Sequence, residues 1–102
     1  MKTVVFNPVA VDDLEEIVEN ISQDNCVAAE AVRRDILDNA EGLADEPGLG
    51  VRPRFSAPRF GGIRYLPCER YPNYLLFYRE LGEEIEVLRI IHGARNLPAL
   101  FE

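Results

Sequence analysis

The chain has 102 residues, of which 47% are apolar, and its formal net charge is −7. This length accommodates a single domain over residues 1–102, and the apolar share is enough for that domain to fold unaided. No apolar run approaches the length of a membrane span. The overall acidity argues against non-specific nucleic-acid binding through a general positive field.

The start of the chain and its cysteines bear on where the protein works. Residues 1–3 lead directly into a short apolar segment, so we expect no signal peptide. Cys26 and Cys68 fall in different expected elements, without the spacing of a metal or redox site. We therefore expect thiols in a reducing cytoplasm, and neither a metal ion nor another cofactor.

The charge is divided unevenly along the chain. Residues 1–50 carry three basic and twelve acidic side chains, whereas residues 51–102 carry eight arginines and six acidic side chains. Arginine suits planar, bidentate contacts with carboxylate or phosphate groups. A local arginine-lined site in the second half therefore remains compatible with the acidic total.

The first half of the chain predicts a strand followed by two helices. Residues 3–6 are β-branched or aromatic, and Asn7-Pro8 is typical of a helix start, with an N-cap followed by proline at the first helical position. Two apolar stripes with helical spacing follow, separated by a polar break at Ser22–Asn25. The first stripe contains Leu14, Ile17, Val18 and Ile21, and the second contains Ala29, Val32, Ile36, Ala40 and Leu43. The pattern predicts an antiparallel αα-hairpin whose apolar side packs on a sheet.

The middle of the chain is rich in proline and glycine. Asp45–Pro58 predicts a long loop, which contains Arg52 and Arg54. A long loop in so small a domain is more often functional than idle. Phe60–Pro67 then predicts a strand that carries Arg64, and residues 69–72 predict a turn.

The most apolar stretch predicts a β-hairpin. Tyr74–Arg79 and Ile85–Ile91 are rich in aromatic and β-branched residues, and the polar segment Leu81–Glu84 between them contains a glycine. Both faces of each run are largely apolar, so the hairpin should lie centrally in its sheet with both faces covered. Tyr74 and Tyr78 are then expected to be core or rim residues.

The element order is β-α-α-β-β-β, which predicts an α+β fold with a small, mainly antiparallel twisted sheet. We expect the αα-hairpin on one face of the sheet and the first strand at the edge beside the last strand. The other face should be concave and partly open, with arginine and aromatic side chains. That face, or the C-terminal tail, is where we expect a partner to bind.

Several motifs occur together in a specific order. They are Asn-Pro-x-Ala-x-x-Asp-Leu at residues 7–14, Glu-Pro-Gly-Leu-Gly at 46–50, Tyr-Leu-Leu-Phe-Tyr-Arg at 74–79 and Leu-Arg-x-x-His-Gly-Ala-Arg at 88–95. With the element order, they make nearly the whole chain similar to the ParE/RelE superfamily of bacterial toxins from type II toxin–antitoxin systems. The ending resembles the ParE-like branch in particular, which includes plasmid stabilisation proteins.

The resemblance implies one of two activities. RelE-like members are ribosome-dependent mRNA endoribonucleases with basic residues on the central strands, an arginine after the last strand and a tyrosine in the tail. Cleavage at a 2′-OH needs a base, positive charge at the phosphate and an acid for the leaving oxygen. ParE-like members lack that set and poison DNA gyrase by protein–protein contact. A cognate antitoxin neutralises the toxin.

The nuclease residues are only partly present. Arg64 and Arg95 match two of the basic positions, but Leu75 stands where an arginine is expected near the start of the third strand, and Phe101 where the tail tyrosine is expected. His92 could act as acid or base, since imidazole titrates near neutrality, or could be a strand-end residue that hydrogen-bonds the turn. The resemblance therefore favours a gyrase inhibitor that is not an enzyme, with antitoxin and gyrase as partners and a dimer or toxin–antitoxin hetero-oligomer as possible assemblies.

The candidate partner-binding residues are basic or aromatic and lie in the second half: Arg59, Arg64, Arg79, Arg89, His92, Arg95 and Phe101. If the protein is a nuclease, the catalytic residues would be Arg64, His92 and Arg95. Arg79 and Arg89 could instead pair across the sheet with Glu80, Glu84 or Glu86. The acidic helices depart from the commonly basic members of this superfamily and leave a third hypothesis open, a non-toxic remnant that acts only as a binding module.

Overall fold

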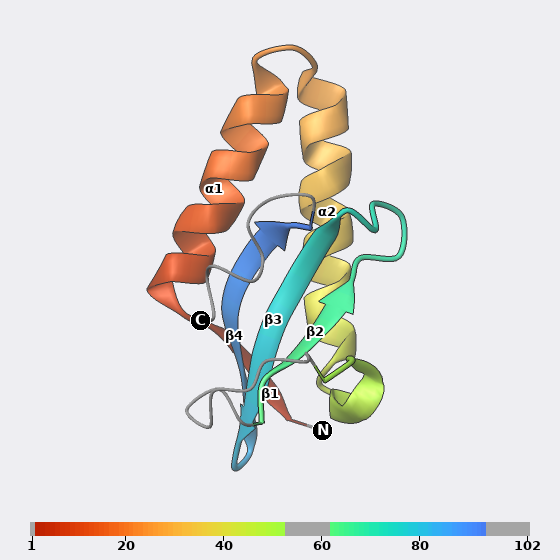
Figure 1. Ribbon diagram of the computed structural model, residues 1–102. Coiled ribbons are helices and arrows are strands. Elements are labelled where there is room, and N and C mark those ends of the chain that lie inside the picture. The colour runs from red at the N-terminus through yellow and green to blue at the C-terminus, as the bar shows by residue number, and fades with distance from the viewer. Residues whose placement is uncertain (1, 53–61, 94–102) are drawn as a thin grey trace.

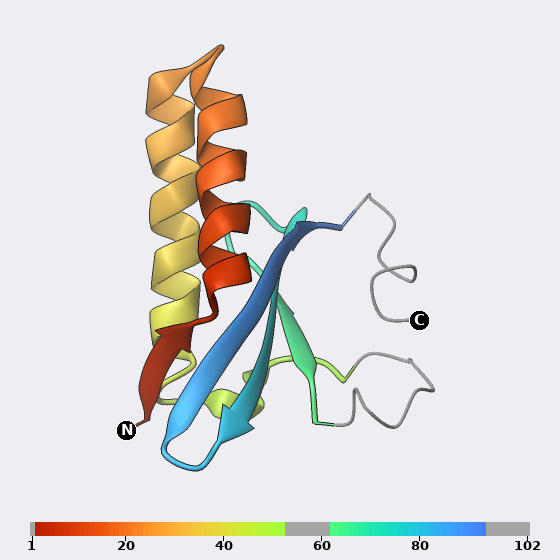
Figure 2. The same ribbon diagram turned by 90° about the vertical axis from the view of Figure 1, so that its left-hand side faces the viewer.

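The computed structural model describes residues 2–52 and 62–93, which form a helical layer against a twisted sheet (Figures 1 and 2). The elements are β1 (Thr3–Phe6), α1 (Pro8–Ser22), α2 (Cys26–Gly42), a short 3₁₀ turn η1 (Pro47–Leu49), β2 (Arg64–Pro67), β3 (Tyr74–Leu81) and β4 (Glu84–His92). This confirms the expected order and the α+β class. Three candidate site residues, Arg59, Arg95 and Phe101, lie outside the described residues, as does the expected strand start at Phe60.

Both helices begin at asparagine caps. The Asn7 side-chain oxygen accepts a hydrogen bond from the Val9 amide at 2.9 Å, and Pro8 follows at the first helical position, as predicted. The Asn25 side-chain oxygen caps α2 in the same way, accepting from the Ala28 amide at 3.0 Å. The short link between the helices makes them an antiparallel pair, and Figure 2 shows both helices on the same side of the sheet.

The four strands have the spatial order β1-β4-β3-β2. The hairpin β3–β4 is therefore central, and β1 lies at the edge beside β4, as predicted; β1 runs parallel to β4, while β2, β3 and β4 are antiparallel. The β3–β4 turn is tighter than the expected Leu81–Glu84, because both of those residues belong to strands. Gly82 opens the turn with φ of 60°, a left-handed conformation that glycine adopts without a steric penalty.

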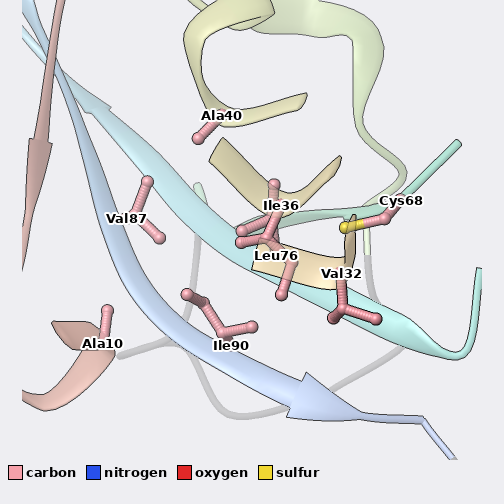
Figure 3. Close-up of a cluster of buried hydrophobic side chains, with 8 residues drawn as sticks. All are labelled: Ala10, Val32, Ile36, Ala40, Cys68, Leu76, Val87 and Ile90. Carbon is pink, nitrogen blue, oxygen red and sulfur yellow. The ribbon is translucent and has the colours of Figure 1, made fainter. Parts of the chain in front are cut away.

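The helices cover one face of the sheet through a continuous apolar core (Figure 3). Alanine, valine and isoleucine side chains from the helices meet leucine, valine and isoleucine side chains from the strands. The buried members are Ala10, Val32, Ile36, Ala40, Cys68, Leu76, Val87 and Ile90. The stripe predicted for α2 is thus confirmed, with Ala29, Val32, Ile36, Ala40 and Leu43 all buried.

The opposite face of the central strands also carries a buried apolar cluster, formed by Ile63, Leu75, Phe77 and Ile91. The two-sided burial predicted for the hairpin is therefore confirmed. We expected arginines to gather on this face, but the guanidinium of Arg89 binds Asp13 on α1 instead. A register shift pairs Phe77 with Arg89 but Tyr78 with Val87, which leaves Leu88 as an extra residue on β4. Bulges of this kind redirect side chains, and Arg89 reaches α1.

Candidate functional site

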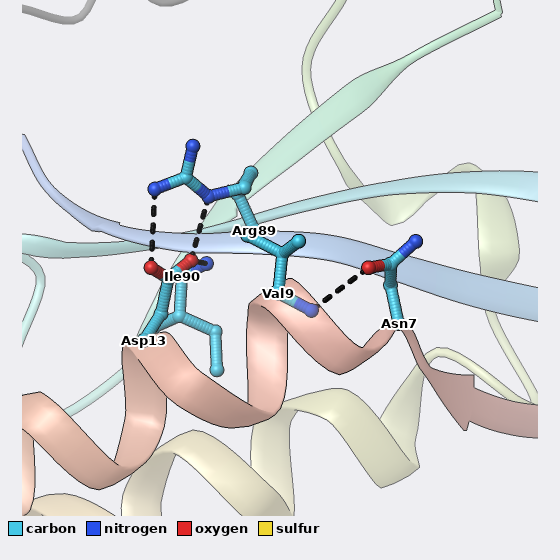
Figure 4. A network of polar contacts seen from close by, with 5 residues as sticks. All are labelled: Asn7, Val9, Asp13, Arg89 and Ile90. Atoms are coloured by element: carbon cyan, nitrogen blue, oxygen red, sulfur yellow. Dashed lines mark hydrogen bonds and ion pairs between the residues drawn. The ribbon is translucent and has the colours of Figure 1, made fainter.

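The first polar feature joins α1 to the end of β4 (Figure 4). The pairing of β1 with β4 ends at Val87, so the edge of β4 beyond it lies beside α1 instead of a strand. There the Asp13 carboxylate on α1 accepts a backbone hydrogen bond from β4, as the carbonyl of a neighbouring strand would. Its carboxylate accepts from the Arg89 guanidinium at 2.7 and 3.1 Å and from the Ile90 amide at 3.0 Å. This hydrogen bonding raises the pKa of Arg89, against the opposing effect of burial.

A second chain of contacts links the start of α1 to the β3–β4 hairpin. The Asn7 amide donates to Glu86 at 3.2 Å, and the other Glu86 oxygen accepts from Arg79 at 2.9 Å. The Asn7 contact first, and then the Arg79 contact, lower the pKa of Glu86. The cross-strand pairing that the sequence offered for Arg79 is therefore confirmed with Glu86, whereas Arg89 pairs with Asp13, a partner that we did not anticipate.

Arg64 holds the loop of residues 46–50, which we call the glycine-rich loop, against the sheet. Its guanidinium donates to the Gly50 carbonyl at 3.0 Å. The buried Tyr78 hydroxyl fixes the same loop, because it donates to the Pro47 carbonyl at 2.7 Å and accepts from the Gly50 amide at 2.8 Å. Burial raises the pKa of Tyr78, while the Gly50 hydrogen bond and then the charge of Arg64 lower it in part. Tyr78 is therefore a core residue, as expected.

Asp35 on α2 was missed by the sequence analysis. It is the buried charged residue of the described core, and its carboxylate accepts from the Arg70 and Tyr71 amides at 3.1 and 3.0 Å and from the Asn39 side chain at 3.0 Å. These contacts fix the turn between β2 and β3. The sequence signal that could have identified Asp35 is its position directly before Ile36, a member of the predicted apolar stripe. Cys68 lies in this turn region, and burial, with the nearby Asp35 charge, raises the pKa of its thiol to about 12.

His92 lies at the end of β4, and its ring meets the Tyr74 ring edge-on, with 5.2 Å between centroids. Both rings border a cleft of about 320 Å³ between α1 and the ends of β3 and β4, which we call the α1–β4 cleft. It is lined by Asp13, Glu16, Ile17, Asn20 and Ile21 of α1 and by Tyr74, Arg89, Ile90, Ile91 and His92 of the strands. The structure thus brings Arg89 and His92 to one cleft, while Arg64 and Arg79 belong to separate contacts.

The described residues do not assemble a metal site. No group of three His, Cys, Asp or Glu side chains among them comes close enough to hold an ion. In the same part of the chain, no helix is long and apolar enough to cross a membrane. The carboxylates of Asp13, Asp35 and Glu86 are already bound by arginines or amides, an arrangement that positions secondary structure.

The fold and these motifs agree with comparisons to known proteins. The chain belongs to the ParE toxin family of type II toxin–antitoxin systems, parDE, whose family model matches residues 4–97. A solved structure of a chromosomal ParDE toxin–antitoxin system from P. aeruginosa is similar, with 25% sequence identity and a TM-score of 0.73, over 90% of this chain and 96% of that chain. No curated protein sequence matches the chain.

Proposed function

We propose that this ParE-type toxin acts by protein–protein contact with DNA gyrase and that a cognate antitoxin holds it inactive. Membership of the ParE toxin family supports the toxin assignment. The choice of contact over RNA cleavage rests mainly on Leu75, the residue at the position where the nuclease branch is expected to use an arginine.

Leu75 is an integral part of the apolar cluster on the sheet. It is 8% exposed and packs with Ile63, Phe77 and Ile91. A leucine side chain cannot neutralise a phosphate, and a charge introduced into this cluster would have to be desolvated. The centre of this sheet face therefore favours packing over phosphate chemistry.

The state of Arg64 supports the same conclusion. Its guanidinium already donates to the Gly50 carbonyl. Tyr65, its neighbour on β2, contacts the apolar cluster, with 5.6 Å between the centres of the Tyr65 and Phe77 rings. Using Arg64 as a phosphate clamp would compete with the contact that holds the loop. The remaining nuclease candidates are His92 and Arg95. Without Arg64, this pair lacks a second basic residue to stabilise the charge that develops at the phosphate during cleavage.

The test is a DNA supercoiling and cleavage assay with purified gyrase and antitoxin-free protein. We expect loss of supercoiling or accumulation of cleaved DNA, and reversal of the effect when the cognate antitoxin is added. Heat-unfolded toxin serves as the control for non-specific inhibition. Unchanged supercoiling at large toxin excess would refute the gyrase proposal.

A parallel translation reaction separates the remaining hypotheses. If the protein cuts mRNA only when ribosomes are present, and Arg95→Ala abolishes cleavage while the fold stays intact, the nuclease hypothesis replaces ours. If neither gyrase nor mRNA is affected, and overproduction without antitoxin is harmless, the protein is a binding module that has lost its toxicity.

A further inference from the structure

The α1–β4 cleft combines an apolar lining with one uncompensated carboxylate. Isoleucines of α1 and β4 and the Tyr74 ring provide the apolar surface, and Glu16 and Asn20 bring polar groups from the helix. Its volume of about 320 Å³ lies at the small end of the range for ligand pockets. The cleft is therefore suited to one long side chain more than to a whole cofactor.

The charges around the cleft favour a cation. Asp13 and Arg89 form an ion pair at 2.7 Å and so compensate each other. Glu16 is exposed and takes part in no ion pair or hydrogen bond with any residue that the structure describes. Of the α1 residues that line the cleft, Asp13 and Glu16 are acidic and none is a lysine or arginine. An acidic side chain entering the cleft would be repelled by Glu16, whereas a basic one would be attracted to it.

The apolar residues define what kind of cation fits. Lysine and arginine bury their aliphatic stems along apolar surface while the charged head stays near solvent or a carboxylate. Ile17 and Ile21 can receive such a stem, and the Tyr74 ring adds apolar surface in the same lining. A small inorganic cation would leave this apolar surface exposed to water.

We infer that the α1–β4 cleft is an anchor site for one arginine or lysine side chain of the antitoxin. The identity of the donor protein rests on the proposed function, whereas the preference for a basic side chain follows from the cleft. Glu16 supplies the charge selectivity, and Tyr74 with the isoleucines supplies the apolar contact.

The test uses N-acetyl-arginine amide as the probe and follows the cleft residues by NMR during a titration. The neutral N-acetyl-norleucine amide and the acidic N-acetyl-glutamate amide are the comparison probes. We expect the arginine probe to bind in the millimolar range, to shift the signals of Ile17, Ile21 and Ile91, and to bind more tightly than either comparison probe.

Variants at neighbouring positions of α1 make the test specific. Glu16→Gln should weaken arginine-probe binding by about two- to fivefold, the usual range for one partly exposed charge pair. Glu16→Lys should reverse the preference, so that the glutamate probe binds better. Glu15→Gln is the matched control, because Glu15 is exposed on the same helix but does not line the cleft, and it should leave binding unchanged.

Each other outcome overturns the inference. The inference fails if the cleft signals do not shift, if the neutral or acidic probe binds as well as the arginine probe, or if Glu16→Gln and Glu15→Gln behave alike. None of these readouts involves gyrase. A failed supercoiling assay with a positive titration therefore refutes only the proposed target, and the reverse result refutes only the anchor site.

Discussion

Replacing Tyr78 with phenylalanine removes a single oxygen from the centre of the protein. The tyrosine is fully buried, and its hydroxyl bridges the Pro47 carbonyl at 2.7 Å and the Gly50 amide at 2.8 Å. The phenylalanine ring would occupy the same volume, so no cavity beyond one oxygen atom would form. The effect of Tyr78→Phe therefore measures the polar bridge between β3 and the glycine-rich loop.

The magnitude follows from what the substitution leaves behind. Each lost hydrogen bond contributes about 1 kcal/mol net, and a buried donor left without a partner costs about 1–3 kcal/mol. Because the loop can shift to let water reach one of the two groups, we expect a loss of about 2 kcal/mol in the free energy of unfolding. For a domain of this size, that corresponds to a fall in Tm of roughly 8–16 °C.

The measurement is urea and thermal unfolding of the toxin alone, followed by circular dichroism. Tyr71→Phe is the matched control, since the Tyr71 hydroxyl makes no hydrogen bond to any residue that the structure describes, and its stability should change by less than about 0.5 kcal/mol. If the two variants are equally stable, the hydroxyl bridge does not hold the loop.

The same variant tests the pH dependence. Because burial raises the pKa of Tyr78 above its ordinary value of 10.0, the unfolded chain loses this proton at lower pH than the folded protein does. The stabilisation is complete below pH 10.0 and is lost as the pH rises through the folded pKa. The stability of the natural protein should therefore fall more steeply above pH 10.0 than that of Tyr78→Phe, and parallel curves would contradict the argument.

Three further predictions concern other parts of the chain. Gly50→Ala should destabilise the protein by about 1–3 kcal/mol, because the new Cβ would lie 2.5 Å from the tyrosine oxygen and 2.9 Å from a backbone carbonyl; Gly48→Ala, where nothing lies within 4 Å, is the control in the same unfolding assay. The pKa of Glu86 is lowered from 4.5, so its stabilisation is present above that pH and is lost as the pH falls through the folded value; acid unfolding should be less steep in Glu86→Gln, and identical acid curves would contradict this. In a thiol-reagent assay, the exposed Cys26 should react at once, whereas Cys68, buried and with its pKa raised to about 12, should react only at the rate of opening or unfolding; fast reaction of both would show that the Cys68 region is open.

Local sequence signals predicted the elements well, because these signals act over a few residues. The Asn7-Pro8 start fixed the beginning of α1, and the spacing of apolar residues identified the buried stripe of α2. The apolar runs on both sides of Gly82 predicted the central hairpin and its burial on two faces. The order of these elements was enough to place β1 beside β4.

The partners of the charged residues were harder to predict. The Arg79 pairing with Glu86 could be predicted from the sequence, because the two residues face each other across a short hairpin whose register the turn sets. The resemblance to RelE-like members offered Arg64 as a phosphate-binding residue if the protein is a nuclease, and in the structure its guanidinium donates to the Gly50 carbonyl. Residue type alone does not distinguish an arginine that binds a ligand from one that satisfies a backbone carbonyl.

The sequence by itself determined the helices, the hairpin, the sheet order and the family, since periodicity, caps and motifs are local or are read along the chain. Only the tertiary structure decided that Arg89 pairs with Asp13 and that Asp35 holds the turn between β2 and β3. The first contact depends on a bulge in β4 and on where α1 crosses its free edge, and the second on the packing of α2 against that turn. Such contacts join residues far apart in sequence, and their geometry exists only once the layers have packed.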